Sequence, residues 1–323
     1  MVRLIARLVL MAVFCTMAAA APAADWPSRP ITLIVPFTPA GGVDAMARVV
    51  AEKLSTALGV QVVVDNRPGG GGTIGTRVVA KAAPDGYTLL LGHSGTIGVN
   101  PSLYVNPGYD VRKDFAPVGM VASMPVALIA NPGFPAKSVA EVIVMARQQA
   151  GKINIGTSPV GTGSYMTAEL FKSVAQLDVT LIPYKGTAPV INDLLGGHVQ
   201  IAFGVLPPAL GNLQAGKLRA IAVASKKRST LLPDVPTFSE SGLPGFEAEL
   251  IYGVLAPAGT PPEIVNRLNA ELQKIVATPD VKERIHAEGG DPQSSTPAEY
   301  VKAIDADETK WRALVKKLGL KVE

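Results

Sequence analysis

Short apolar runs alternate along the chain with segments whose apolar residues recur at helical spacing. The runs at 31–35, 60–64 and 88–91 are almost continuously apolar, which is typical of strands buried on both faces of a parallel sheet. Residues 44–58 and 76–83 place apolar side chains three or four positions apart, which predicts helices. This alternation predicts an α/β fold with mainly parallel sheets flanked by helices.

The same alternation continues through the second half of the chain, and 323 residues are enough for two lobes. Pro125 breaks a long apolar stretch at 118–130, where we expect the chain to cross from the first lobe to the second. The run at 218–224 is the candidate for the return crossing. Further predicted strands lie at 153–155, 179–182 and 197–203. A fold with two lobes and two crossings has a hinged cleft.

The first 23 residues have the pattern of a secretory signal peptide. Arg3 and Arg7 make the start basic, residues 8–20 are apolar but too short to span a bilayer comfortably, and Ala21-Pro-Ala23 supplies small residues for cleavage. The expected division is therefore a signal peptide at 1–23, a first lobe at 24–124, a second lobe at 125–224, and a return to the first lobe with C-terminal helices at 225–323.

Composition narrows the chemistry of the exported protein. The single cysteine, Cys15, lies within the signal peptide, so the mature chain has no disulfide, thiolate chemistry or cysteine-ligated metal. The formal charge falls from +4 to +2 once Arg3 and Arg7 are removed. The remaining bases are scattered, which argues against nucleic-acid binding. No later apolar run reaches membrane-spanning length, so we expect a soluble protein outside the cytoplasmic membrane.

The loop after the first strand has the character of an anion site. Thr38-Pro-Ala-Gly-Gly42 follows strand 31–35 and precedes a helix for which Asp44 is the expected N-cap. A strand, a glycine-containing loop and a helix N-terminus together direct backbone N–H groups and the positive end of the helix dipole at one place. Most such turns in α/β proteins bind nothing. This turn is a candidate anion site only because a similar arrangement recurs later in the chain.

The recurrence lies in the predicted second lobe. The strand at 153–155 leads into the loop 156–164, which is rich in glycine and hydroxyl groups, and a helix follows. Farther on, residues 183–189 form another loop before a helix. Two helix N-termini from different lobes can therefore share one anion, and Lys185 could add positive charge or be a solvated loop residue.

A third glycine-rich segment carries a different pattern. Gly70-x-Gly72-x-x-Gly75 matches the dinucleotide fingerprint formally, but the next strand ends in Gly92-His-Ser-Gly95 without the acidic residue that a ribose requires. Close packing of the loop against its helix explains these glycines better. Residues 92–96 still place hydroxyls and an imidazole at the carboxyl end of a strand, where ligands bind in open α/β sheets.

Catalytic patterns are weak along the whole sequence. His93, His198 and His286 have unrelated surroundings and no metal-ligand spacing, so we expect no metal and no cofactor. Gly161-Thr-Gly-Ser164 is not a nucleophile elbow, and no P-loop lysine follows a glycine-rich loop. Two alternatives to a binding receptor stay open: an exported hydrolase or dinucleotide-dependent enzyme using Ser164 or His93, and a ligand sensor for a signalling partner.

Two threonines predict helix starts in the last third of the chain. Thr260-Pro-Pro-Glu263 and Thr296-Pro-Ala-Glu299 both fit a capping box, in which the Thr and Glu side chains bond each other's backbone N–H groups.

Several blocks, in order, resemble the Bug-type receptors of tripartite tricarboxylate transporters, which are periplasmic solute-binding proteins. The resemblance covers essentially the whole mature chain. The blocks are Pro36-Phe37, Gly41-Gly42-x-Asp44, Asn66-Arg-Pro-Gly-Gly-Gly-Gly-Thr-Ile-Gly75, Pro84-Asp-Gly-Tyr-Thr-Leu-Leu90, Pro183-Tyr-Lys-Gly186, Asp193-Leu-Leu-Gly-Gly197 and Val235-Pro-Thr-Phe-Ser-Glu-Ser-Gly-Leu-Pro-Gly-Phe246.

The resemblance implies a two-lobe periplasmic binding-protein fold that closes on a small organic anion, often a di- or tricarboxylate, an amino acid or an aromatic acid, and delivers it to integral-membrane subunits. We expect a monomer. Many relatives carry a histidine where this chain has Tyr165, so the ligand of a relative does not transfer directly. Together, the residues and the resemblance give these candidate ligand-binding positions: Phe37, Thr38, Pro39, Ala40, Gly41, Gly42, His93, Ser94, Thr96, Ser158, Gly161, Thr162, Gly163, Ser164, Tyr184, Lys185, Gly186 and Thr187.

Overall fold

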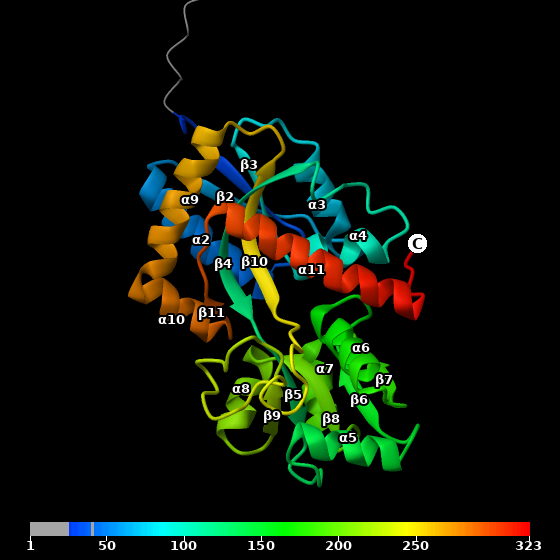
Figure 1. The fold of residues 1–323 in the computed structure, drawn as a ribbon. Coiled ribbons are helices and arrows are strands. Elements are labelled where there is room, and N and C mark those ends of the chain that lie inside the picture. The colour runs from blue at the N-terminus through cyan, green and yellow to red at the C-terminus, as the bar shows by residue number, and fades with distance from the viewer. Residues whose placement is uncertain (1–25, 40–41) are drawn as a thin grey trace, which may run out of the picture.

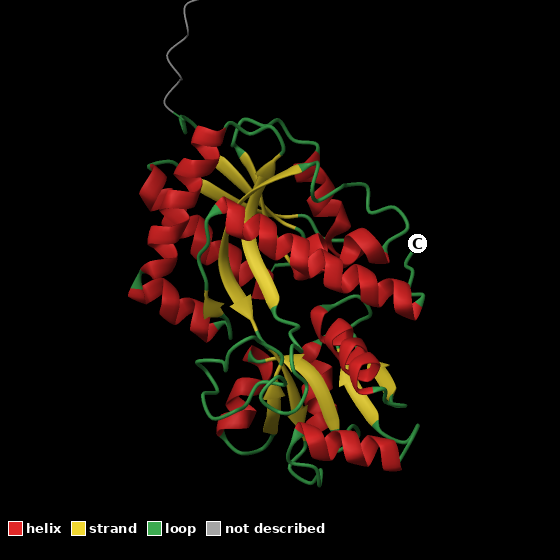
Figure 2. Cartoon of the chain, viewed as in Figure 1, coloured by secondary structure: helices red, strands yellow, loops and turns green. Residues whose placement is uncertain are grey.

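A computed structural model describes residues 26–39 and 42–323, which form two α/β lobes stacked end to end (Figure 1). The predicted signal peptide at 1–23, together with Ala40 and Gly41, lies outside the described residues. Each lobe has its own sheet with helices packed against it (Figure 2). The predicted α/β fold with two lobes is therefore confirmed.

The first lobe holds a six-stranded sheet in the order β11-β4-β10-β3-β1-β2. β1 runs parallel to both neighbours, so Leu33 lies opposite Val64 on one side and Leu89 on the other. β10 runs antiparallel to β3 and to β4. The strands of this sheet are β1 (Ile31–Val35), β2 (Val62–Asn66), β3 (Thr88–His93), β4 (Phe115–Met124), β10 (Leu250–Pro257) and β11 (Asp291–Pro292).

The second lobe holds a five-stranded sheet in the order β7-β6-β8-β5-β9. β6 is parallel to β7 and β8, whereas β5 is antiparallel to β8 and β9. Both sheets are therefore mixed: β10 and β11 run against the other strands of the first sheet, and β5 runs against the other strands of the second. The strands of this sheet are β5 (Val126–Ala130), β6 (Asn154–Thr157), β7 (Thr180–Pro183), β8 (Ile201–Val205) and β9 (Arg219–Val223).

Helices cover the sheets of both lobes (Figure 2). Helix α11 is the longest of the described helices and crosses the first lobe toward the second (Figure 1). The helices are α2 (Gly42–Leu58), α3 (Thr73–Ala80), α4 (Asn100–Leu103), α5 (Val139–Gln148), α6 (Gly163–Ala175), α7 (Thr187–Leu195), α8 (Pro207–Gln214), α9 (Pro262–Ala277), α10 (Pro279–Ala287) and α11 (Pro297–Leu318), with a 3-10 turn at Gly70–Gly72 and a π-helical turn at Gly95–Val99.

The first crossing between the lobes lies at Pro125. β4 ends at Met124 in the first sheet, and β5 begins at Val126 in the second. The return lies later than residues 218–224, because β9 is itself a strand of the second sheet and the chain re-enters the first sheet as β10. Between them, residues 225–249 place Phe238 and Phe246 against Phe171 of the second lobe, at ring-centroid distances of 5.6 and 6.3 Å.

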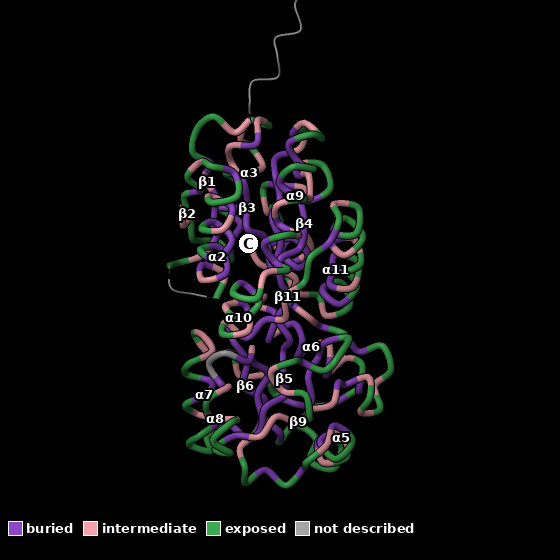
Figure 3. The backbone as a smooth tube through the Cα atoms, turned by 90° about the vertical axis from the view of Figure 1, so that its left-hand side faces the viewer, coloured by how far each residue is buried: buried purple, intermediate pink, exposed green. Residues whose placement is uncertain are grey.

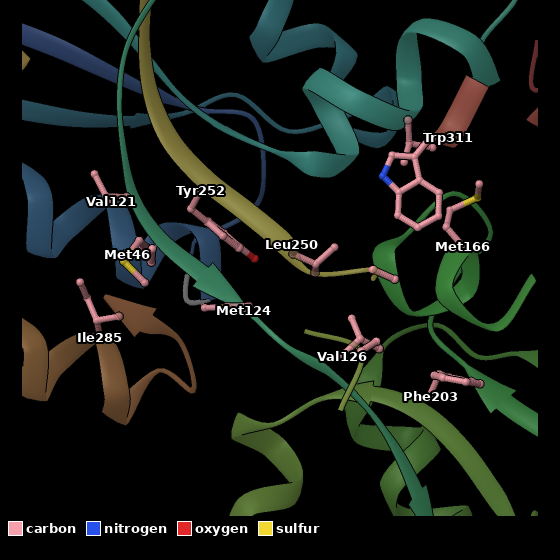
Figure 4. Close-up of a cluster of buried hydrophobic side chains, with 14 of the residues drawn as sticks. Met46, Val121, Met124, Val126, Met166, Phe203, Leu250, Tyr252, Ile285 and Trp311 are labelled. Carbon is pink, nitrogen blue, oxygen red and sulfur yellow. The ribbon is translucent and has the colours of Figure 1, made fainter. Parts of the chain in front are cut away.

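One hydrophobic core continues from lobe to lobe through these crossings. Met124, Val126 and Leu250 all belong to the buried cluster that includes the cores of both sheets. The burial pattern along the chain shows the same buried path through the junction (Figure 3), and side chains from both lobes meet there (Figure 4). The junction is therefore packed, and the open space between the lobes lies beside it.

The two predicted capping boxes have different outcomes. Thr296 and Glu299 form a complete box at the start of α11, as predicted. The box at Thr260 is wrong: α9 begins at Pro262, and the Thr260 hydroxyl donates to the carbonyl of Pro257. Because Pro261 and Pro262 lack N–H groups, the turn bonds back to the preceding strand.

Candidate functional site

A cavity of about 660 Å³ lies between the lobes and is lined from both sides. Such a volume suits a small ligand or cofactor. Its described lining comprises Phe37, Thr38, Gly42, Val43, Gly71, His93, Gly95, Asn100, Leu103, Tyr104, Ser158, Pro159, Val160, Gly161, Thr162, Gly163, Ser164, Gly186, Thr187, Val205, Leu250 and Tyr252. Gly42 and Gly163, which begin helices in opposite lobes, therefore face the same space.

The loop after β1 is tied to the start of α2 by a polar network. Asn66 donates from Nδ2 to the Phe37 carbonyl at 3.0 Å and to Oδ1 of Asp44 at 2.9 Å. Arg48 donates two further hydrogen bonds to the Asp44 carboxylate at 2.9 and 3.1 Å. The predicted N-cap role of Asp44 is wrong, because Asp44 is buried inside the first turn of α2. It holds the loop and the helix together instead.

The glycine-rich loop before α3 is shaped for close packing. A Cβ atom on Gly75 would lie 2.7 Å from the Arg67 carbonyl oxygen and 2.8 Å from Cα of Pro36. Gly71 and Gly72 have φ angles of 60° and 94°, which favour glycine. The sequence resembles a dinucleotide fingerprint for this structural reason, and only Gly71 of this loop lines the cavity.

His93, at the end of β3, lies between two aromatic rings. Its ring centroid is 4.8 Å from that of Phe37 and 5.6 Å from that of Tyr252. The Gly95 N–H donates to Nδ1 of His93 at 2.7 Å, so the proton of the neutral ring is on Nε2. Burial lowers the pKa of His93 from 6.5 to about 4. At neutral pH, His93 is therefore an uncharged hydrogen-bond donor.

The second lobe presents the starts of two helices to the cavity. Thr162 precedes α6 and Gly186 precedes α7, and neither helix has a side-chain cap. The N–H of Ser158 donates to Oγ of Ser164 at 3.0 Å, and the hydroxyls of Ser158 and Thr187 are 3.1 Å apart. These bonds link the two loops. The first-turn N–H groups of α6 and α7 are thus available to an anion.

The predicted positions fall into three groups. Eleven line the cavity, five lie elsewhere, and Ala40 and Gly41 are outside the described residues. The eleven are Phe37, Thr38, Gly42, His93, Ser158, Gly161, Thr162, Gly163, Ser164, Gly186 and Thr187. The five are Pro39, Ser94, Thr96, Tyr184 and Lys185.

The positions away from the cavity have structural partners or face solvent. Ser94 accepts the N–H of Ile251 at 2.9 Å, and Thr96 donates its hydroxyl to the His93 carbonyl. The Tyr184 hydroxyl donates to Asp193 at 2.7 Å, while Lys185 is exposed. Tyr165, where the family resemblance predicted a histidine, similarly donates to Glu169 at 2.9 Å and does not line the cavity.

The sequence did not predict about half of the residues that line the cavity. The missed residues are Val43, Gly71, Gly95, Asn100, Leu103, Tyr104, Pro159, Val160, Leu250 and Tyr252, whereas Val205 lies in a segment already expected to influence pocket size. Leu250 and Tyr252 belong to β10, which the periodicity analysis overlooked. Its apolar run from Leu250 to Pro257 was the available signal.

The electrostatics of the cavity come from the backbone. Among its described lining residues none is Asp, Glu, Lys or Arg. Helices α2, α6 and α7 all begin at the cavity wall, and each N-terminus carries roughly half a positive charge. Within residues 26–39 and 42–323, no group of three or more His, Cys, Asp or Glu residues could hold a metal ion. This arrangement suits a small anion held by N–H donors.

Two lobes around a ligand-sized cleft, each contributing helix N-termini, define the class of periplasmic solute-binding proteins. In the described part of the chain, no helix is long and apolar enough to cross a membrane. Residues 46–320 match the model of the tripartite tricarboxylate transporter family receptor. The chain belongs to this family, as its resemblance predicted. It is therefore a binding receptor and not an enzyme.

Full-length relatives support the assignment. The chain is 38% identical to Protein BugT of Bordetella pertussis over 325 residues, covering 100% of this chain and 99% of BugT. A solved structure of R. palustris Rpa4515 with adipate is similar at a TM-score of 0.80 and 36% identity, over 92% of this chain and 100% of that one. MatC from Rhodopseudomonas palustris with bound malate is similar at a TM-score of 0.75 and 33% identity, over 90% and 100%.

Proposed function

We propose that this receptor captures a small carboxylate in the cleft between its lobes and delivers it to integral-membrane subunits of a transporter. The observation that carries the proposal is the meeting of three helix N-termini, those of α2, α6 and α7, at one cavity without charged side chains in its described lining. Adipate and malate, held by the two similar proteins, are small acids of this kind.

The proposed binding mode places carboxylate oxygens on the first-turn N–H groups of α2 and α6. The cavity-lining candidates Thr38, Gly42, Thr162, Gly163 and Ser164 would surround them. Hydrogen bonds to a charged group contribute about 1.5–3 kcal/mol each, so several N–H donors hold a carboxylate without an arginine. Closure of the lobes over the bound acid then presents one defined surface to the membrane subunits.

A thermal-shift panel of mono-, di- and tricarboxylates and aromatic acids tests this proposal. A ligand at about 100 times its dissociation constant adds about 2.7 kcal/mol of stability. Gly163→Ala serves as the binding-site control, because its Cβ atom would meet the Leu250 side chain in the cavity wall and disturb the start of α6. The ligand must be recovered unchanged. No shift with any acid, or chemical conversion of the ligand, contradicts the proposal.

We further propose that the mature receptor starts near residue 24 after removal of the signal peptide at 1–23 and acts as a monomer in the periplasm. The basic start and small-residue end of that segment support export. The proposed lobe division keeps the first boundary at 124/125 and moves the second from 224/225 to 249/250, because residues 225–249 pack on the second lobe. Mass spectrometry of the exported protein and its size by light scattering test the cleavage and the monomer.

A further inference from the structure

A second hollow, separate from the cleft cavity, lies between the end of α11 and α4 in the first lobe. Its volume is about 450 Å³. We call it the basic hollow, because its described lining includes three bases and no Asp or Glu. The bases are Arg312, Lys316 and Lys321, and they surround a wall that includes Tyr104, Val105 and Leu320. The basic hollow therefore combines positive charge with apolar surface.

The side chains of the basic hollow are partly held in place and partly exposed. Arg312 forms an ion pair with Glu308, and Nζ of Lys321 donates to the Ser102 carbonyl at 3.3 Å. Lys316 is exposed and lies four residues after Arg312, so both bases share one face of α11. Val105 is 68% exposed, more than any other large apolar side chain in the described part of the chain. Exposed apolar surface rimmed by charge is typical of a site that binds another protein.

The basic hollow lies next to the cleft and to the contact between the lobes. Tyr104 lines both the hollow and the cleft cavity. The end of α11 reaches α6 of the second lobe (Figure 1), where Nζ of Lys317 donates to Oγ of Ser173 at 2.7 Å. Trp311 of α11 and Met166 of α6 are both fully buried at this junction (Figure 4). A change in the angle between the lobes must alter these contacts, so a partner bound here would meet different surfaces on the open and closed receptor.

We propose that the basic hollow is the docking site for an acidic segment of the integral-membrane subunits. The inference rests on the proposed delivery of the ligand and assigns a surface to it. Carboxylates of the segment pair with the bases on α11 and with Lys321, and an apolar side chain of the segment covers Val105. A single small anion would leave Val105 uncovered, and a flat lipid surface does not enter a hollow. A protruding protein segment matches both the shape and the charge.

Binding of the purified receptor to the integral-membrane subunits, held in nanodiscs of neutral phosphatidylcholine, tests the docking site. We expect Lys316→Glu and Val105→Glu each to weaken this binding at least about tenfold, because the new carboxylate would repel the acidic segment. Added salt should weaken binding of the wild type. Absence of wild-type binding, or wild-type affinity in both variants, overturns the proposal.

Two matched controls carry the same changes away from the basic hollow. Lys302→Glu lies on the same helix, and Val144→Glu lies on α5 at a position 53% exposed. Both should bind the subunits like the wild type, and losses equal to those of Lys316→Glu and Val105→Glu would overturn the assignment to this hollow. Melting temperatures establish that each variant is folded.

Calorimetry with the best acid from the thermal-shift panel separates docking from ligand capture. All four variants should bind the acid with wild-type affinity, because none of the substituted residues lines the cleft cavity. Absence of acid binding by the wild type overturns carboxylate capture. Normal acid binding by variants that also dock normally overturns only the role of the basic hollow.

Two further measurements use the unaltered protein. Hydrogen exchange of the wild-type receptor should slow at 101–105 and 316–321 when the subunits bind, and protection confined to other segments overturns the proposal. Binding to phosphatidylglycerol vesicles without binding to the subunits would assign the hollow to a lipid headgroup instead. A dimer in light scattering that Val105→Glu dissociates would assign it to a second copy of the chain. Either result overturns the proposed occupant.

Discussion

The backbone N–H of Gly95 donates to Nδ1 of His93 at 2.7 Å, and this contact sets the chemistry of the only histidine in the described cavity wall. It leaves the proton on Nε2, and burial beside Phe37 and Tyr252 lowers the pKa of the ring and keeps it neutral. The histidine at the end of β3 is therefore a fixed polar donor rather than a titrating base near neutral pH.

The lowered pKa of His93 predicts a loss of stability in acid. The pKa is 6.5 in the unfolded chain and about 4 in the folded protein, so the unfolded chain binds more protons between these values. The stability that the buried neutral ring allows is fully present above pH 6.5 and is lost as the pH falls toward 4. In urea unfolding, the loss of unfolding free energy between these pH values should be about 1–3 kcal/mol larger in the wild type than in His93→Gln, which has no group that titrates there. An unchanged pH dependence in the variant would contradict the buried, neutral state.

Removing the Asp44 carboxylate should weaken the loop that carries Phe37. Asp44 is 3% exposed and binds both Arg48 and Asn66, so Asp44→Ala leaves two donors without their acceptor. We expect a loss of about 1–3 kcal/mol in the free energy of unfolding. Arg48→Ala is the control: the Arg48 side chain is 55% exposed, and its loss should cost less than about 1 kcal/mol. If chemical denaturation shows the same loss of unfolding free energy for both variants, the loss comes from the Asp44–Arg48 ion pair alone.

Substitution of a glycine by alanine tests whether that glycine is needed for close packing or has open space around it. Gly75→Ala forces Cβ against the backbone of Arg67 and Pro36 and should destabilise the protein by about 1–3 kcal/mol. Gly211→Ala, at an exposed position of helix α8 with nothing within 4 Å of the added atom, should stabilise it by about 0.4–1 kcal/mol. Melting temperatures that move in the same direction would contradict the packing role of Gly75.

The aromatic cluster should fix residues 225–249 to the second lobe. Phe238 is fully buried, and its ring centroid lies 4.5 Å from that of Phe246 and 5.6 Å from that of Phe171. Phe238→Ala should lower the free energy of unfolding by about 3–5 kcal/mol. Val174→Ala, at a position 51% exposed, should change it by less than about 0.5 kcal/mol. Similar losses for both variants would mean that the cluster contributes little.

The sequence predicted the local elements around the cavity because their signals are local. The apolar run at 31–35 became β1, and the glycine-rich segment before Ser164 became the loop that leads into α6. Eleven of the proposed ligand positions line one cavity because loops that follow parallel strands emerge at the same edge of a sheet. The assignment to a receptor family followed from blocks of residues spread over the whole chain.

Side-chain partners could not be read in this way. Asp44 has the residue type and place of an N-cap, yet it meets Asn66, which is 22 positions away. Tyr184 lies in a predicted binding loop, but its hydroxyl turns to Asp193 instead. Tyr252 lines the cavity because β10 joins its sheet beside β3, and the apolar run of β10 does not reveal this placement.

By itself, the sequence determined the alternation of strands and helices, the glycine-bearing loops and the family. These follow from residue periodicity and backbone freedom, which act over a few positions. The tertiary structure decided that β10 returns antiparallel, that Gly42 and Gly163 face one cavity, and that Gly95 fixes the tautomer of His93. Each of these depends on packing and hydrogen-bond geometry in three dimensions, which local sequence signals do not specify.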